Sequence, residues 1–120
     1  MIINTNKIEE TERKHAYNGA GALLCKVLLT EEQWKNEIRL CNRLRLKPGS
    51  EIGYHTHVDD YELYYILSGT GSLNDNGEIK PVSTGDLIYT ADGAGHSLLN
   101  DGEEDLELLA IVINVNSETP

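Results

Sequence analysis

The chain has 120 residues and a mass of 13.3 kDa, the size of a single domain that can bury its own core. Twenty acidic and ten basic side chains give a net charge of -10, so we expect no nucleic acid and no anionic membrane surface as a partner. The first ten residues hold no apolar segment of signal-peptide length, and no stretch reaches the length of a spanning helix, which predicts a cytoplasmic protein.

The composition favours an all-β fold. Eleven glycines and three prolines among many isoleucines, leucines and valines are typical of tight turns between short strands. Residues 1–18 are polar and lack a clean period, which predicts an N-terminal arm or edge segment. Residues 22–29 then form a short apolar strand, and 30–33 fit a capping box that opens one turn of helix. We expect Trp34 to cover the barrel edge there.

A strict alternation of apolar and polar residues begins at Ile38 and predicts the clearest strand of the chain. One face comprises Ile38, Leu40, Leu44 and Leu46 with Asn42 among them, and the other comprises Arg39, Cys41, Arg43 and Arg45. A buried amide is costly without hydrogen bonds, so we expect Asn42 to line a pocket or to contact a ligand.

The two cysteines, Cys25 and Cys41, are too few for a disulfide framework or a zinc knuckle, and we interpret them as packing residues. An alternative concerns Cys41 alone. If Arg39 and Arg43 flank it on one strand face, the two cations would favour its thiolate.

Further short strands follow at a spacing of about ten residues, which favours a sandwich or jelly-roll barrel. They are predicted at 54–57, 62–67, 78–82, 87–90, 96–100 and 106–115, with Asn76-Gly77 as a type I′ hairpin turn. Residues 63–67 and 106–113 are apolar on both faces. Since such strands are covered on both sides, one face should look into the barrel and the other should meet a second sheet or a second subunit, which predicts a homodimer.

His55 and His57 stand two residues apart and therefore point to the same face of a strand. Two adjacent imidazoles form half of a metal site, although such a pair can also satisfy itself or the backbone. Glu62 has the opposite parity, but a turn through residues 58–61 would let the next strand bring it to the same place.

The glycines around these residues carry a resemblance. Gly49, His55, His57, Glu62 and Gly69 match the pattern G-x5-H-x-H-x4-E-x6-G, which is the first motif of the cupin superfamily. The second motif, G-x5-P-x-G-x2-H-x3-N, is matched by Gly85, Gly93, His96 and Asn100, with Ala91 in place of the proline. The chain thus resembles a small RmlC-like cupin, with motif 1 at 49–69 and motif 2 at 85–100 of one domain spanning 1–120.

The resemblance implies a double-stranded β-helix, the cupin jelly-roll barrel, that holds one divalent metal on His55, His57, Glu62 and His96. Three imidazoles and one carboxylate suit Mn, Fe, Ni, Zn or Cu, whereas Ca and Mg prefer all-oxygen ligands. Four protein ligands on an ion that takes six leave two positions for water, dioxygen or a chelating molecule.

Two functions fit these features. The first is a metal-dependent enzyme that acts on a small chelating organic molecule by oxygenation, decarboxylation or isomerisation, as some cupins with all four ligands do. The second is a non-catalytic barrel that binds or senses a sugar or another small ligand, because fold alone does not fix function.

A few other residues complete the predicted site and its surroundings. Tyr64 shares the face of Glu62 and should point into the pocket, whereas Tyr54, Tyr65 and Tyr89 are expected in the core. Asn100 is expected to hold a turn. The acidic run 101–105 lacks calcium-loop spacing and is interpreted as a solvated turn.

Overall fold

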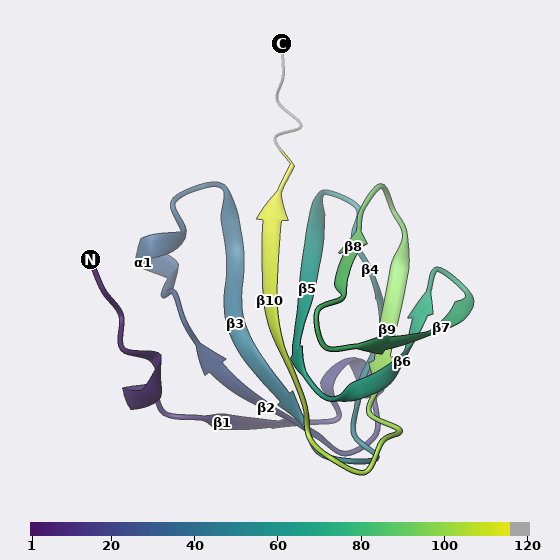
Figure 1. Cartoon of the computed structure of the whole chain (residues 1–120). Coiled ribbons are helices and arrows are strands. Elements are labelled where there is room, and N and C mark those ends of the chain that lie inside the picture. Colours follow the sequence, from purple (N-terminus) through teal and green to yellow (C-terminus); the bar gives the residue numbers. More distant parts are fainter. Residues whose placement is uncertain (116–120) are drawn as a thin grey trace.

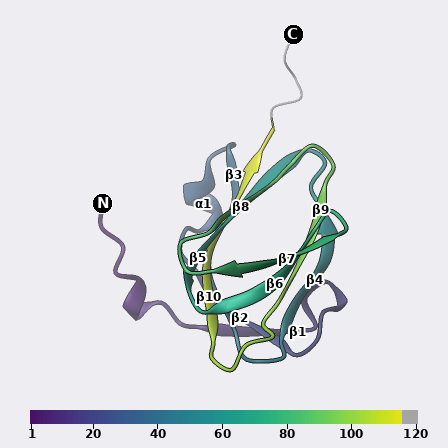
Figure 2. The same cartoon turned by 45° about the vertical axis from the view of Figure 1, so that its right-hand side comes forward.

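The computed structural model of the chain describes residues 1–115 as an all-β barrel made of two antiparallel sheets (Figures 1 and 2). One sheet has the order β1-β2-β3-β10-β5-β8 and the other β4-β9-β6-β7. The strands are β1 (Thr11–Lys14), β2 (Ala22–Val27), β3 (Ile38–Leu46), β4 (Glu51–Thr56), β5 (Asp60–Ser68), β6 (Thr70–Asp75), β7 (Glu78–Ser83), β8 (Leu87–Thr90), β9 (Gly95–Leu99) and β10 (Leu106–Asn114). The predicted jelly-roll is confirmed, while residues 116–120 of the expected single domain lie outside the described residues.

Three short helical segments accompany the strands: η1 (Thr5–Lys7), η2 (Ala16–Asn18) and α1 (Glu31–Trp34). The predicted capping box opens α1, where the Thr30 backbone N–H donates to Gln33 Oε1 at 3.0 Å. The Trp34 indole N–H donates to the Leu29 carbonyl at 3.0 Å, and α1 packs beside β3. No helix among residues 1–115 is long and apolar enough to cross a membrane.

The register of β10 divides the barrel interior into an apolar half and a polar half. At its start Leu106 pairs with Leu46 of β3, and both side chains are fully buried. Near its end Val112 pairs with Leu40 of β3 and with Glu62 of β5. The hydrophobic core therefore fills one half, and the inward-facing polar side chains gather in the other.

The observed strands follow the predicted periods closely and differ mainly at their ends. The inner face of β3 is buried at Asn42, Leu44 and Leu46 and half-buried at Ile38 and Leu40. Both residues of the Asn76-Gly77 turn have positive φ, 50° and 100°. β2 ends at Val27 rather than at residue 29, because the next two backbone N–H groups both donate to the Cys41 carbonyl. β4 starts at Glu51, three residues earlier than predicted, because Glu51 pairs with Leu99 of β9.

The expectation that most tyrosines lie in the core is wrong. Tyr54, Tyr65 and Tyr89 are 47%, 44% and 61% exposed. Tyr65 and Tyr89 occupy the outward positions of β5 and β8, since their strand neighbours Tyr64 and Ile88 point inward. Alternation along a strand sends every second residue to the outer face, so residue type alone did not predict burial.

The N-terminal residues run along one edge of the six-stranded sheet. β1 is its edge strand and pairs with β2 from Thr11–Cys25 to Lys14–Ala22. Before β1 the chain extends away from the barrel (Figure 1). After β1 it turns through η2, which packs against β4 of the other sheet. The segment therefore crosses from one sheet to the other.

Candidate metal centre

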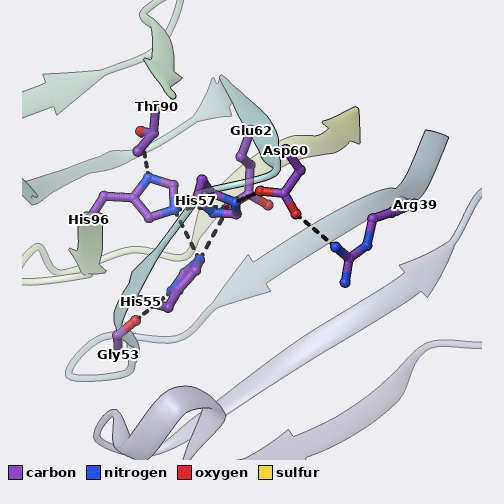
Figure 3. A network of polar contacts seen from close by, with 8 residues as sticks. All are labelled: Arg39, Gly53, His55, His57, Asp60, Glu62, Thr90 and His96. Atoms are coloured by element: carbon purple, nitrogen blue, oxygen red, sulfur yellow. Dashed lines mark hydrogen bonds and ion pairs between the residues drawn. The ribbon is translucent and has the colours of Figure 1, made fainter. Parts of the chain in front are cut away.

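The imidazoles of His55, His57 and His96 converge with the Glu62 carboxylate in the polar half of the barrel (Figure 3). Glu62 Oε1 lies 3.3 Å from His55 Nε2, 3.0 Å from His57 Nε2 and 2.9 Å from His96 Nε2. His55 Nε2 and His96 Nε2 are 3.0 Å apart. The sequence placed these four residues in one site, and the structure brings all of them together.

Strand pairing explains this convergence. His55 of β4 and His96 of β9 are direct cross-strand partners. His57 lies just after β4, and the turn that follows resets the phase so that Glu62 of β5 points inward. The bend at 91–95 is tied to His57, whose N–H donates to the Ala94 carbonyl at 3.0 Å and whose carbonyl accepts from Gly93 at 2.8 Å. These bonds hold the bend in which Ala91 replaces the usual proline.

Each histidine is oriented through its second ring nitrogen. The Nδ1 atoms of His55, His57 and His96 lie 2.8 Å from the Gly53 carbonyl, 2.6 Å from Asp60 Oδ1 and 2.8 Å from Thr90 Oγ1. Because a carbonyl and a carboxylate only accept, Nδ1 of His55 and His57 carries the proton. Their Nε2 lone pairs are then directed at the centre of the cluster.

The pKa shifts reflect burial opposed by this network. Burial raises the pKa of Glu62, but the three imidazoles outweigh it and hold that pKa well below its usual value. Burial lowers the pKa of His57, and hydrogen bonds to Glu62 and Asp60 reverse the shift so that the net pKa is raised. For His96 burial prevails, and its pKa is lowered. The carboxylate is therefore ionised and His96 is neutral, the forms in which both bind metals.

The donor set fits a divalent transition metal. Two ligand atoms about 2.1 Å from one ion and at right angles lie about 3.0 Å apart, which matches the spacing of the Nε2 and Oε1 atoms. Lone pairs of like polarity repel at such distances unless a proton or a cation lies between them. The directed imidazoles and the ionised carboxylate therefore suit a cation, and nitrogen ligands favour a transition metal over Ca or Mg.

A cavity of about 110 Å³ opens beside the cluster and contains both predicted pocket residues. Its lining consists of Arg13, Tyr17, Leu23, Cys25, Leu40, Asn42, Leu44, Ile52, His55, His57, Glu62, Tyr64 and Val112. The Tyr64 ring stacks on the His96 ring at 4.7 Å and is 2% exposed, and burial raises the pKa of its hydroxyl. Within residues 1–115, Asn42 Oδ1 is a buried side-chain atom without a hydrogen-bond partner.

Sequence reasoning missed the residues at the N-terminal side of this cavity. Tyr17 stacks on the His55 ring, with centroids 4.0 Å apart and planes at 15°, and the Arg13 guanidinium lies 4.8 Å from the Tyr17 centroid. The polar segment 1–18 gave no period that could place them. Sequence reasoning also missed Asp60, whose carboxylate accepts a hydrogen bond from His57 Nδ1 and pairs with Arg39 at 3.1 Å.

Two other expectations are settled outside the cluster. The thiolate hypothesis for Cys41 is wrong, because burial raises the pKa of the thiol while Arg39 and Arg43 pair with Asp60 and Glu107. Asn100 holds a turn, as expected: its side-chain amide donates to the carbonyls of Leu46 and Glu104, each at 2.8 Å, and Oδ1 accepts from the Gly102 N–H.

Comparisons with known proteins agree with this architecture. A family model described as a cupin domain matches residues 42–112. An oxalate-binding protein of Thermotoga maritima is 38% identical over 113 residues, which cover 94% of this chain and 93% of that protein. The crystal structure of a predicted oxalate decarboxylase from Thermotoga maritima superposes with a TM-score of 0.93 at 37% identity, covering 96% of this chain and all of the other. An RmlC-like cupin from Shewanella frigidimarina shares the fold, with a TM-score of 0.75 at 15% identity over 98% of this chain and 93% of that one.

Proposed function

The chain belongs to the cupin family, and on that basis we propose that it binds one divalent transition metal together with a small chelating acid such as oxalate. The proposed metal ligands are His55, His57, Glu62 and His96, and the ion is Mn, Fe, Ni, Zn or Cu. The observation that carries the proposal is the convergence of three Nε2 atoms on Glu62 Oε1 while each Nδ1 is held by its own partner.

The size and walls of the cavity support a small acid as the ligand. A cavity of about 110 Å³ suits a small acid, since pockets for drug-sized ligands are about 300–1,000 Å³. The relative at 38% identity is named for binding oxalate. A bound metal would supply Lewis-acid attraction for the two oxygens of a chelating acid at the positions that the protein leaves free.

Asn42 and Tyr64 are the proposed contacts for this acid. Asn42 brings a buried amide whose oxygen has no partner within residues 1–115, and its neighbours on the β3 face, Leu40 and Leu44, are apolar. The raised pKa of Tyr64 keeps its hydroxyl protonated, so it can donate to a carboxylate. Together they would orient an acid that is already held at the metal.

Metal content and oxalate binding test this function directly. The protein purified without added metal is analysed for metals, loaded with Mn²⁺ or Ni²⁺, and titrated with oxalate in a calorimeter. We expect one ion per chain and binding of oxalate only by the loaded protein. A protein that takes up no divalent ion would refute the proposed metal site. A metal-loaded protein that does not bind oxalate would refute the proposed ligand.

Metal-dependent catalysis is the second candidate. It is favoured by a cavity that adjoins the cluster and is walled by apolar side chains such as Leu23, Leu44 and Ile52, where a metal-held acid would be shielded from water. Apart from the proposed metal ligands, the lining groups Cys25 and Tyr64 have raised pKa values and keep their protons. Oxygen uptake and carbon dioxide release with small diacids, diketones and thiols separate an enzyme from a non-catalytic binding or sensing barrel.

We further propose that the described barrel belongs to one domain spanning 1–120 and that this domain forms a homodimer. The outer face of the six-stranded sheet carries Leu63, Leu109 and Ile111, all half-buried, beside the exposed Leu87 and Tyr89. A contiguous apolar surface of this kind favours association with a second copy. Sedimentation analysis tests it: a monomer at micromolar concentration would contradict the homodimer.

A further inference from the structure

Residues 13–19, called the N-terminal strap below, lie across the N-terminal side of the metal cavity. Arg13 pairs with Leu23 across β1 and β2, and both residues line the cavity. Tyr17 lies in η2 and covers the His55 ring at 4.0 Å. The guanidinium carbon of Arg13 lies 4.8 Å from the centroid of the same Tyr17 ring. Arginine, tyrosine and metal-site histidine thus form one stack.

The position of the strap is fixed by an unusual backbone. His15, Tyr17 and Asn18 have φ values of 53°, 51° and 62°, in the left-handed region that non-glycine residues seldom adopt. The strap also approaches β4 so closely that a Cβ on Gly53 would stand 1.9 Å from the Tyr17 carbonyl oxygen. This strain is concentrated where the strap places Tyr17 over His55, which points to a role at the cavity.

Arg13 differs from the other arginines in its partners. Within residues 1–115, Arg39, Arg43 and Arg45 each pair with a carboxylate, whereas Arg13 pairs with none and has only the Tyr17 ring. It is also the one lysine or arginine among the residues that line the cavity. Its side chain is exposed, so an anionic ligand can reach it as a counterpart even though the chain has a net charge of -10.

The charges at the site supply that counterpart, if the proposed function is correct. A divalent ion and the Glu62 carboxylate leave one positive charge, because the histidines bind metal in their neutral form. A dianionic acid such as oxalate turns this into one negative charge. The guanidinium of Arg13 restores neutrality, while Asp60 is already balanced by Arg39.

We propose that Arg13 and Tyr17 form an anion-selecting mouth over the metal cavity, in which Arg13 attracts and orients the charged end of a dicarboxylate ligand. Tyr17 acts as the positioning residue, because its ring contacts both the guanidinium of Arg13 and the ring of His55. This proposal rests on the proposed function and adds the group that selects dianionic ligands over neutral chelators. Arg13 needs no part in holding the metal.

Calorimetric titration of oxalate into the Mn²⁺-loaded protein tests the mouth. Arg13→Gln should weaken oxalate binding about ten-fold at low ionic strength and flatten its dependence on salt, while metal content stays at the wild-type level. Acetohydroxamate, a chelator of lower charge, should lose much less affinity. Arg13→Lys should recover part of the loss. Lys14→Gln is the matched control, because Lys14 is the next cation along β1, is exposed like Arg13 and does not line the cavity.

The possible results separate this inference from the proposed function. If Arg13→Gln kept its oxalate affinity, its salt dependence and its metal content, the proposed role of Arg13 would be refuted, whereas the proposed metal site would not be affected. An equal loss in Lys14→Gln would also refute that role, because overall charge would then suffice. A metal-loaded wild-type protein that binds no oxalate would refute both the proposed ligand and the mouth, since the mouth would have no anion to select.

Discussion

The two sides of the cavity are built in different ways. On the metal side, four side chains come from β4, the turn after it, β5 and β9, and each histidine has a hydrogen-bond partner for its second nitrogen. On the mouth side, Arg13 lies near the end of the edge strand β1, while Tyr17 lies in the strained backbone of η2 and is placed by stacking. Hydrogen-bonded strands fix ligand geometry, whereas a stacked strap can change with little effect on the metal. The two sides should therefore fail separately.

The largest expected effect is the loss of a metal ligand. His96→Ala removes a fully buried imidazole that lies 2.9 Å from Glu62 Oε1, and we expect metal affinity to fall by more than about 100-fold, beyond the cost of losing an outer partner. Metal analysis after dialysis measures it. His15→Asn is the control, because His15 is the histidine outside the cluster and Asn tolerates its φ of 53°. Equal metal content in both variants would contradict the assignment.

The partners of the histidines should rank by charge. Asp60→Asn removes the carboxylate that accepts from His57 Nδ1, and we expect a loss of about 10–100-fold in metal affinity. Thr90→Val removes a neutral hydroxyl beside His96 Nδ1 and should cost less, because charge-assisted hydrogen bonds are about twice as strong as neutral ones. Competition with a metal-binding dye compares the two variants. A larger loss in Thr90→Val would show that charge is not the deciding factor.

A substitution at the contact between strap and strand should affect the mouth side more. The Cβ of Gly53→Ala would stand 1.9 Å from the Tyr17 carbonyl oxygen, so the strap must move, and we expect a cost of about 1–3 kcal/mol in the free energy of unfolding. Oxalate binding should weaken while metal content is kept. Urea unfolding and calorimetry give both quantities.

The control for this variant is Gly102→Ala. Its Cβ would meet the Thr70 hydroxyl at 3.0 Å, in the turn between β9 and β10, and Gly102 does not line the metal cavity. We expect a smaller change in stability there and unchanged oxalate binding. If Gly53→Ala removed the metal as well, the two sides of the cavity would not be independent.

The same division decides how much the sequence could predict. His55 and His57 were predictable as neighbours because a period of two puts them on one face of a strand. Glu62 and His96 joined them only through the resemblance to the two cupin motifs. Asn42 was predictable because an amide on an apolar face needs a reason. The ends of β2 and β4 depend on which distant carbonyl or strand takes each N–H group, and the sequence does not encode that locally.

The mouth could not be predicted for a related reason. Tyr17 reaches His55 only because the strap approaches the backbone of β4 at Gly53, 36 positions further along the chain. No periodic pattern in residues 1–18 signals such a contact. The Asn18-Gly19 pair indicates a turn, but not the strand against which the turn packs. Residues placed by backbone packing between distant segments are thus read from the structure.

The smallest expected effect concerns the ion pair that precedes the strap. Glu10 pairs with Arg45 of β3 at 2.6 Å, and this hydrogen bond lowers the pKa of Glu10 below 4.5. A lowered folded-state pKa stabilises the fold above the unfolded value and ceases to do so as the pH falls through the folded one. Glu10→Gln should therefore cost at most about 1 kcal/mol at pH 7, and the difference from wild type should shrink as the pH falls below 4.5 and vanish below the lowered pKa of the folded state. Urea unfolding as a function of pH measures it, with the exposed Glu9→Gln as control.

Oxalate affinity should change less than about two-fold, because the Tyr17 stack and the strand pairing of β1 still hold Arg13. A larger loss would mean that the mouth depends on this ion pair as well as on stacking.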